Sequence, residues 1–167
     1  MTFHFTRRTA AVVSAAALGL GGALTAAVPA AQAATALPTC TVGNLKVSLG
    51  AQDHGAGQLY WPIRFTNTSG HTCALRGYPG TSVLNGARHQ IGAAAGRTGQ
   101  SYGTVTLRPG RTAVSVIHTT NGPLGGACRA TGSYVRVYPP ASYTAVTLPA
   151  RLQVCSGQFT VTPVALQ

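Results

Sequence analysis

The sequence predicts an all-β fold, an antiparallel β-sandwich. Apolar and polar residues alternate with a period of two in several short segments, as they do in half-buried strands. Glycine and proline turns separate these segments at regular intervals. No stretch of ten or more residues after residue 33 shows helical periodicity. About eight to ten short strands of this kind are typical of a sandwich.

The clearest strand pattern begins at Leu59. Alternate residues from Leu59 to Phe65 are large and apolar, and burying each of them contributes roughly 1.5 to 3 kcal/mol. Within this strand, Trp61 needs a partner for its indole N–H. Pro62 cannot donate a backbone hydrogen bond and therefore predicts an edge strand or a bulge.

Two turns follow, and together they predict a β-meander of three neighbouring strands. Residues 67–70, Asn-Thr-Ser-Gly, have turn chemistry, and we interpret the Asn67-Thr68-Ser69 glycosylation triplet as part of that turn. Alternation resumes over residues 73–78. Tyr78-Pro79-Gly80 then turns the chain into residues 81–84, which lead to the hairpin signal Asn85-Gly86.

Other segments complete the predicted strands more weakly. Residues 88–92 complete the Asn85-Gly86 hairpin, and residues 102–107 and 112–118 form a second hairpin around Pro109-Gly110. Further strands are expected at residues 45–49, 134–138, 143–148 and 158–164. Loops are expected at residues 53–57, 119–127 and 93–101, the last of them small, glycine-rich and mobile.

Residues 1–33 read as an export signal, which leaves a single secreted domain at residues 34–167. Arg7 and Arg8 precede an apolar run that ends at Val28, and the small-residue site 31–33 follows. The paired arginines raise the twin-arginine route without deciding against the general one. Thr39 is a poor residue before a lipidated cysteine at Cys40, so we expect free secretion or loose association with the cell wall.

Four cysteines lie after the signal, and an even number in an oxidising compartment favours disulfides over metal ligands. Four cysteines allow three pairings. We favour Cys40 with Cys73 and Cys128 with Cys155, which would tie the first strand to the meander and the last strand to the region before it.

Charge is the most unusual feature of the composition. The chain has twelve lysines and arginines and one acidic residue, Asp53. After signal removal the excess is about nine positive charges, so salt bridges cannot hold the fold together.

The residues give no conventional catalytic or metal site, and we expect no enzymatic activity, metal or cofactor. Glycosidases of the usual kind need two carboxylates, and this chain has one. A serine triad could use only Asp53, and no G-x-S-x-G motif occurs. The histidines lack the spacing typical of zinc ligands.

One constellation could bind a polyanion or a glycan. Tyrosines and arginines alternate on strand faces opposite the expected core, and such residues stack on ligands and form bidentate phosphate contacts. The same residue types also suit any solvent-facing strand, which is the simpler interpretation. The candidate surface comprises Tyr60, Arg64, Arg76, Tyr78, Tyr134, Arg136 and Tyr138.

Several motifs resemble a known family. NTSGHTCALRGYPG at residues 67–80, LRPG at 107–110, RVYPP at 136–140 and the late Cys155 are similar to the secreted actinobacterial domains of unknown function, family 4232. The resemblance spans about Cys40 to Val164. It implies an exported, disulfide-bearing, Ig-like β-sandwich and no assigned reaction.

These observations predict a secreted binding or adhesion module whose basic surface contacts anionic polymers of the envelope or matrix. The alternative is a protein-recognition or inhibitor module that binds an unidentified protein through loops such as 93–101 or 119–127. In either case the mature chain is expected to have no membrane span.

Overall fold

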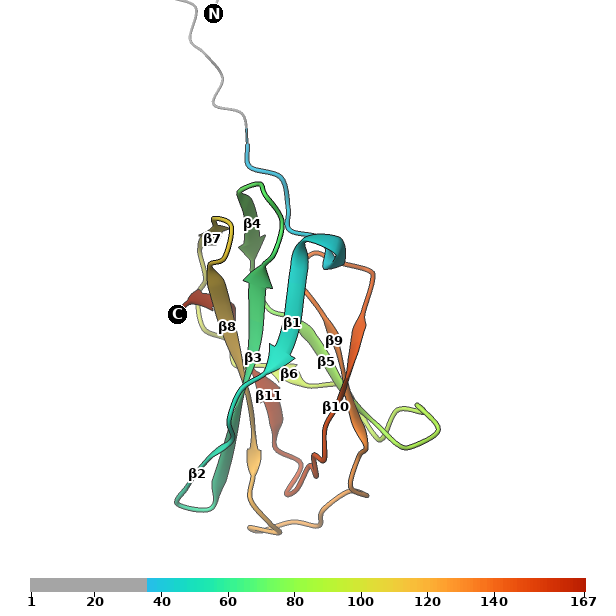
Figure 1. Ribbon diagram of the computed structural model, residues 1–167. Coiled ribbons are helices and arrows are strands. Elements are labelled where there is room, and N and C mark those ends of the chain that lie inside the picture. Colours follow the sequence, from blue (N-terminus) through green and yellow to red (C-terminus); the bar gives the residue numbers. More distant parts are fainter. Residues whose placement is uncertain (1–35) are drawn as a thin grey trace, which may run out of the picture. The chain divides into compact units, whose positions relative to one another are not determined.

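The computed structural model describes residues 36–167, and the predicted export signal lies outside them (Figure 1). In this part the chain forms strands and one short 3₁₀ helix, and no α-helix. The elements are η1 (Val42–Asn44), β1 (Leu45–Leu49), β2 (Asp53–Gly55), β3 (Gln58–Asn67), β4 (Cys73–Arg76), β5 (Gly80–Leu84), β6 (Gly96–Arg97), β7 (Thr104–Leu107), β8 (Thr112–Thr120), β9 (Tyr134–Tyr138), β10 (Val146–Pro149), β11 (Phe159–Val161) and β12 (Ala165–Leu166).

The strands form three sheets. The largest has the order β1-β3-β8-β11-β6, with β2 beside β3 and β12 beside β8. A second sheet has the order β10-β9-β5, and β4 pairs with β7 in a third. The pairing is antiparallel except between β6 and β11, which are parallel. The predicted all-β class is therefore confirmed, with one parallel pair that the sequence did not predict.

Burial alternates along the central strands, as the period-two pattern predicted. In β3 the odd-numbered residues from Leu59 to Phe65 are buried, and β8 shows the same alternation beside it. Side chains from all three sheets form one hydrophobic core. Its members include Leu45, Val47, Trp61, Ile63, Phe65, Leu75, Val83, Leu107, Ile117, Val135, Val137, Phe159 and Val161.

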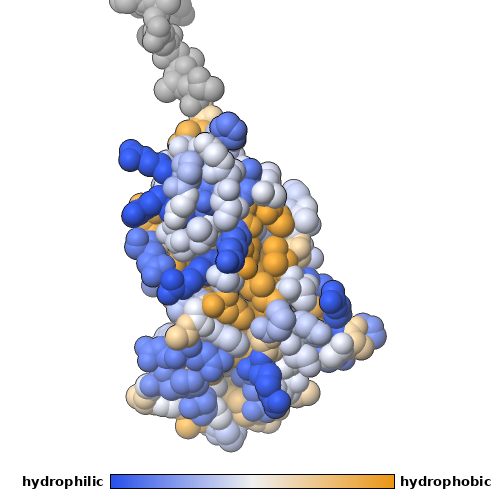
Figure 2. Space-filling view, viewed as in Figure 1, coloured by the Kyte–Doolittle hydropathy of each residue, from blue (hydrophilic) through white to orange (hydrophobic). Residues whose placement is uncertain are grey.

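The core is less covered where β1 and β10 face each other. Figure 2 shows apolar residues gathered at the surface between these two strands. Leu49, Val146 and Leu148 are half-buried and pack against the core. β1 ends the large sheet and β10 ends the second one, so this strip marks a side where two sheet edges meet.

Pro62 lies in a central strand, so the predicted edge strand is wrong, but the predicted bulge is present. The register passes from Leu49 opposite Ile63 to Asp53 opposite Tyr60, so three residues face two and one extra residue is inserted beside Pro62. Gly50 N donates to Pro62 O at 2.8 Å, which makes these residues a hydrogen-bonded antiparallel pair. In such a pair residue 62 would also donate to Gly50 O, and proline cannot. The indole of Trp61 donates to Gly50 O instead, at 2.8 Å. One side chain thus satisfies its own N–H and the carbonyl that proline leaves unpaired.

The predicted meander is also wrong. β3, β4 and β5 belong to three different sheets, since β4 pairs with β7 and β5 pairs with β9. The turns at residues 67–70 and 78–80 do redirect the chain, and turn chemistry does not specify which strand the chain meets next.

Other local expectations had mixed outcomes. The strand expected at residues 88–92 does not form, and a single isolated β-bridge between Leu84 and Gln90 links the two sides of the Asn85-Gly86 turn. The second hairpin does not form, because β7 pairs with β4 while β8 pairs with β3. The predicted loop at residues 53–57 contains β2, and the predicted loop at 93–101 contains β6.

Both favoured disulfides are present, Cys40–Cys73 and Cys128–Cys155. The first joins the segment before η1 to β4, and the second joins the residues before β9 to the segment before β11. Their loops span 33 and 27 residues, so the chain-entropy model assigns each about 3.5 kcal/mol. All four cysteines are therefore paired.

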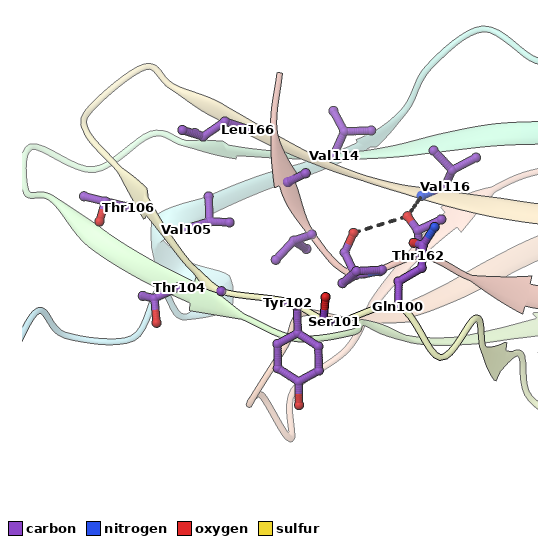
Figure 3. Close-up of a pocket in the computed structure, with 14 residues that line it drawn as sticks. Gln100, Ser101, Tyr102, Thr104, Val105, Thr106, Val114, Val116, Thr162 and Leu166 are labelled. Carbon is purple, nitrogen blue, oxygen red and sulfur yellow. Dashed lines mark hydrogen bonds between the residues drawn. The ribbon is translucent and has the colours of Figure 1, made fainter.

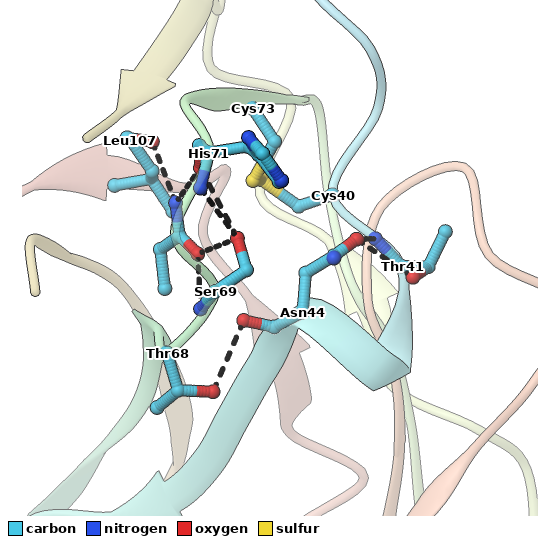
Figure 4. Close-up of a disulfide and its surroundings, with 9 residues drawn as sticks. Cys40, Thr41, Asn44, Thr68, Ser69, His71, Cys73 and Leu107 are labelled. Carbon is cyan, nitrogen blue, oxygen red and sulfur yellow. Dashed lines mark hydrogen bonds between the residues drawn. A yellow bond between two sulfur atoms is a disulfide. The ribbon is translucent and has the colours of Figure 1, made fainter. Parts of the chain in front are cut away.

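Asn67 fixes the turn that follows β3, whose residues Ser69 and His71 are labelled in Figure 4. Its side chain is fully buried, and Nδ2 donates to the carbonyls of His71 at 2.7 Å and Leu107 at 2.9 Å. Its Oδ1 accepts from the backbone N–H and the hydroxyl of Ser69. The Asn67-Thr68-Ser69 triplet therefore has a structural role in the turn, as we interpreted it.

Candidate functional site

The candidate tyrosines and arginines do not form one surface. Tyr60 and Arg64 lie on β3 in the large sheet, and Arg76 and Tyr78 lie at the end of β4. Residues 134, 136 and 138 lie on β9 in a different sheet. The structure therefore divides the candidate residues among three places.

Four residues form the tightest group, which we call the Tyr78–Tyr102 cluster. The rings of Tyr78 and Tyr102 meet edge to face, with centroids 5.4 Å apart. The guanidinium of Arg76 lies 5.7 Å from the centroid of Tyr102, and that of Arg97 lies 5.6 Å from the centroid of Tyr78. These distances are typical of cation–π contacts. The cluster therefore presents two arginines against two aromatic rings.

Backbone pairing between distant segments positions this cluster. Arg97 is in β6, which is held by its parallel pairing with β11. Tyr102 lies two residues before β7, which pairs with β4 and so brings Tyr102 to Arg76. Gly77 has φ +100°, and a Cβ there would lie 3.4 Å from the ring of Tyr102. The positive φ therefore favours glycine at this position, and a Cβ would make only ordinary van der Waals contact with the ring.

Sequence reasoning found Arg76 and Tyr78 and missed their partners. Arg97 lies in a segment we expected to be a mobile loop, and Tyr102 was expected only to begin a strand. Tyr78 Oη also donates to Gln100 O at 2.6 Å, which fixes the loop against the ring. Only the β4–β7 and β6–β11 pairings reveal that these residues meet.

A second arginine–tyrosine arrangement lies on β9. Arg136 lies 5.7 Å from the ring centroid of Tyr138, and its Nη2 donates to Gln90 Oε1 at 2.7 Å. Arg88 lies 5.4 Å from the ring centroid of Tyr134. Arg88 and Arg136 therefore contact neutral groups only, and these contacts leave both positive charges unneutralised.

The third place contains Tyr60 and Arg64. The ring of Tyr60 stacks on that of His118, with centroids 4.6 Å apart and planes at 9°. The Nη1 of Arg64 donates to Gln167 Oε1 at 3.2 Å. Tyr60 therefore stacks on histidine, and these two candidate residues use different partners.

Two of the histidines considered for catalysis contact glutamine side chains rather than Asp53, and one of them, His118, is the ring that stacks on Tyr60. Asp53 is exposed in β2, and the His54 ring contacts Gln52 Oε1 rather than Asp53. His118 Nε2 lies 2.6 Å from Gln58 Oε1. Among residues 36–167, no three histidines, cysteines or acidic residues are grouped closely enough to hold a metal ion.

An apolar groove adjoins the Tyr78–Tyr102 cluster (Figure 3). It has a volume of about 940 Å³ and shares Tyr102 with the cluster. Val105 lines one side, and Val114 and Val116 of β8 line the floor. Sequence reasoning did not predict this groove, because its walls come from strands whose pairing could not be inferred.

The sequence is similar to one family of domains. The sequence matches a family described as "Domain of unknown function (DUF4232)" over residues 40–165. No curated protein and no solved structure matches the chain significantly. Residues 36–167 also contain no helix with the length and hydropathy that crossing a membrane requires. The match covers most of the chain and includes both disulfides and the Tyr78–Tyr102 cluster, so the chain belongs to the DUF4232 family of domains of unknown function.

Proposed function

We propose that this chain is a secreted, non-enzymatic domain that binds anionic polymers of the cell envelope or extracellular matrix through the Tyr78–Tyr102 cluster. Export by residues 1–33 and an Ig-like arrangement of the packed sheets are parts of the same proposal. The observation that carries it is the placement of Arg76 and Arg97 against two tyrosine rings. Two disulfides are consistent with an extracellular location.

The cluster has the chemistry that phosphate polymers require. An arginine that rests on an aromatic face keeps its N–H edge free for a bidentate contact with phosphate. The ring also restricts the arginine, so less side-chain entropy is lost when an anion binds. Tyr102 is 44% exposed, which leaves its ring accessible for stacking on a base or a sugar.

The charge of the whole chain supports the same ligand class. Asp53 is the only acidic residue of the sequence, and it pairs through its backbone with Tyr60 of β3, which is not a cluster residue. A surface with this excess of positive charge attracts polyanions over a Debye length and speeds their association. The cluster would give such attraction a defined contact point.

Co-sedimentation with washed cell-wall particles and with DNA-coated beads across a salt series tests this proposal. The test variant carries Arg76→Gln and Arg97→Gln. The control carries Arg108→Gln and Arg151→Gln, which remove the same charge from two exposed arginines outside the cluster. Each phosphate contact contributes about 0.7 to 0.9 to the slope of log affinity against log salt. We expect the test variant to lose about 1.4 to 1.8 of that slope.

The control variant should lose much less of the slope than the test variant does. Equal losses in both variants would show that net charge alone causes binding, and the cluster would then have no special role. Absence of sedimentation at low salt with either particle would refute polyanion binding altogether.

A further inference from the structure

The groove beside Tyr102 has open strand edges on both sides. Residues 100–106 form one side and residues 162–166 form the other, and Val114 and Val116 of β8 also line the groove (Figure 3). No charged side chain lines it, and Leu166 at its end is 55% exposed. Apolar surface and unpaired backbone are therefore presented together.

The free edge of β7 faces the groove. Ala74 N donates to Pro38 O, and Cys40 N donates to Ala74 O, so the polar backbone groups of Ala74 point away from β7. Because these groups alternate along a strand, Cys73 and Leu75 bond to β7, and Thr104 and Thr106 point the other way. Within residues 36–167, β7 pairs only with β4.

β12 also has unpaired backbone groups in the described residues, on the edge that faces away from β8. Gln167 N donates to Thr112 O, so the polar backbone groups of Leu166 point away from β8. One position earlier on this edge, Val164 N donates to Gly77 O at 2.9 Å. That bond closes the groove at the Tyr102 end, and the edge beyond it is unpaired in the described residues.

Arginines flank the apolar floor. Arg76 is opposite Thr104 in the β4–β7 register and lies against Tyr102. Arg64 is opposite Val114 in the β3–β8 register and reaches Gln167. A ligand that lies along the groove would therefore meet positive charge near both of its ends.

We propose that this groove binds an extended peptide segment of a partner protein, which adds a strand to β7, places alternate apolar residues over Val114 and Val116, and carries acidic residues at its ends. Strand addition satisfies the free backbone groups of Thr104 and Thr106. A hydrocarbon chain could fill the groove and would leave these groups unpaired. A second copy of this chain has one acidic residue and would be repelled by its own charge.

Fluorescence anisotropy with a labelled synthetic peptide tests the proposal on the oxidised domain. The probe has two glutamates, six residues alternating threonine and valine, and two more glutamates. One comparison peptide replaces the glutamates with lysines, and another has its six central amides N-methylated so that it cannot donate backbone hydrogen bonds. We expect each change to weaken binding roughly tenfold or more.

Matched variants of the chain separate strand addition from loss of fold. Thr106→Pro removes the N–H that faces the groove without removing a bond to β4, and Thr106→Ala keeps that N–H. We expect roughly tenfold weaker peptide binding for Thr106→Pro and little change for Thr106→Ala. Leu166→Glu should weaken binding by repelling the acidic ends, and Leu166→Lys should not. Circular dichroism establishes that each variant is folded.

Several results would overturn this proposal. Equal binding of the N-methylated peptide would indicate attraction by charge alone, and equal binding of the lysine peptide would exclude a role for Arg64 and Arg76. No binding of the parent peptide at about 1 mM would exclude strand addition of this kind. A dimer in sedimentation velocity that Leu166→Glu dissociates would assign the groove to a second copy. Thr106→Pro carries no charge change, so its wall and DNA binding should persist, which separates this proposal from the polyanion proposal.

Discussion

Replacing Trp61 with phenylalanine should destabilise the domain through the carbonyl of Gly50. The indole N–H donates to Gly50 O at 2.8 Å, and Pro62 cannot supply the bond that the sheet would otherwise make there. Trp61→Phe leaves this carbonyl without a partner, which costs about 1 to 3 kcal/mol. The smaller ring also leaves space in the core, which adds to the loss.

A double-mutant cycle isolates the hydrogen-bonding part. Pro62→Ala restores a backbone N–H that is aimed at Gly50 O, because residues 50 and 62 form a hydrogen-bonded pair. Trp61→Phe should therefore cost about 1 kcal/mol less in the Pro62→Ala background than in the native chain. The lost packing and the changed entropy of the unfolded chain occur in both backgrounds and cancel.

Urea unfolding followed by far-ultraviolet circular dichroism measures all four proteins. Fluorescence cannot serve, because Trp61 is the only tryptophan of the chain. Equal slopes of the free energy against urea would establish that the comparison concerns stability. If the two substitutions are additive within about 0.3 kcal/mol, the indole does not replace the missing backbone donor, and the reasoning is refuted.

Three further predictions concern other parts of the fold. Replacing either disulfide pair with serines should lower the free energy of unfolding by about 3.5 kcal/mol, as measured in urea, and reduction of the native chain, which breaks both disulfides, should cost about the sum of the two losses. Asn67→Ala should cost about 3 kcal/mol or more because it leaves buried carbonyls unpaired, whereas exposed Thr68→Ala should cost less than about 0.5 kcal/mol; similar costs would contradict the structural role of Asn67. Gly132→Ala places a Cβ against the side chain of Val83 and 3.0 Å from Leu84 O, so it should lower thermal stability by about 1 to 3 kcal/mol, while Gly70→Ala, which meets nothing within 4 Å, serves as its control.

Strands with strong alternation could be predicted from the sequence because their pattern depends only on one buried face. β9 has the bounds that the pattern indicated, and β3 extends one residue beyond its predicted pattern at each end. The favoured disulfide pairing is also confirmed, although the cysteines alone left three pairings open. Short strands such as β2 and β6 depend on their neighbours and leave no periodic signal of their own.

Strand pairing could not be predicted, because turn residues specify a reversal and not a partner. The turn at Tyr78-Pro79-Gly80 carries the chain from one sheet to another, as the turn at Pro109-Gly110 does. Pro62 correctly indicated a bulge, and its other interpretation, an edge strand, was wrong for a related reason. A missing donor is tolerated in a central strand when a neighbouring side chain supplies it, and only the register shows that Trp61 does so.

The candidate site could likewise be predicted only in part, because residue types are visible in the sequence and strand pairing is not. Arg76 and Tyr78 are neighbours in sequence and were identified by residue type. Arg97 and Tyr102 reach them through the β6–β11 and β4–β7 pairings, which no local pattern encodes. Tyr60 was grouped with Arg64 by alternation, yet its ring stacks on His118.

The neutral partners of the arginines connect the fold to the proposed binding. Six guanidinium groups contact neutral partners, through cation–π contacts with tyrosine rings or hydrogen bonds to amide and backbone carbonyl oxygens. They belong to Arg64, Arg76, Arg88, Arg97, Arg129 and Arg136. Such contacts fix the position of an arginine without cancelling its charge, whereas an ion pair would do both. The positive potential therefore persists at the surface, and a bound anion lowers the repulsion among fixed charges as well as making its own contacts. An anionic ligand that binds only the native state would thus also stabilise the fold.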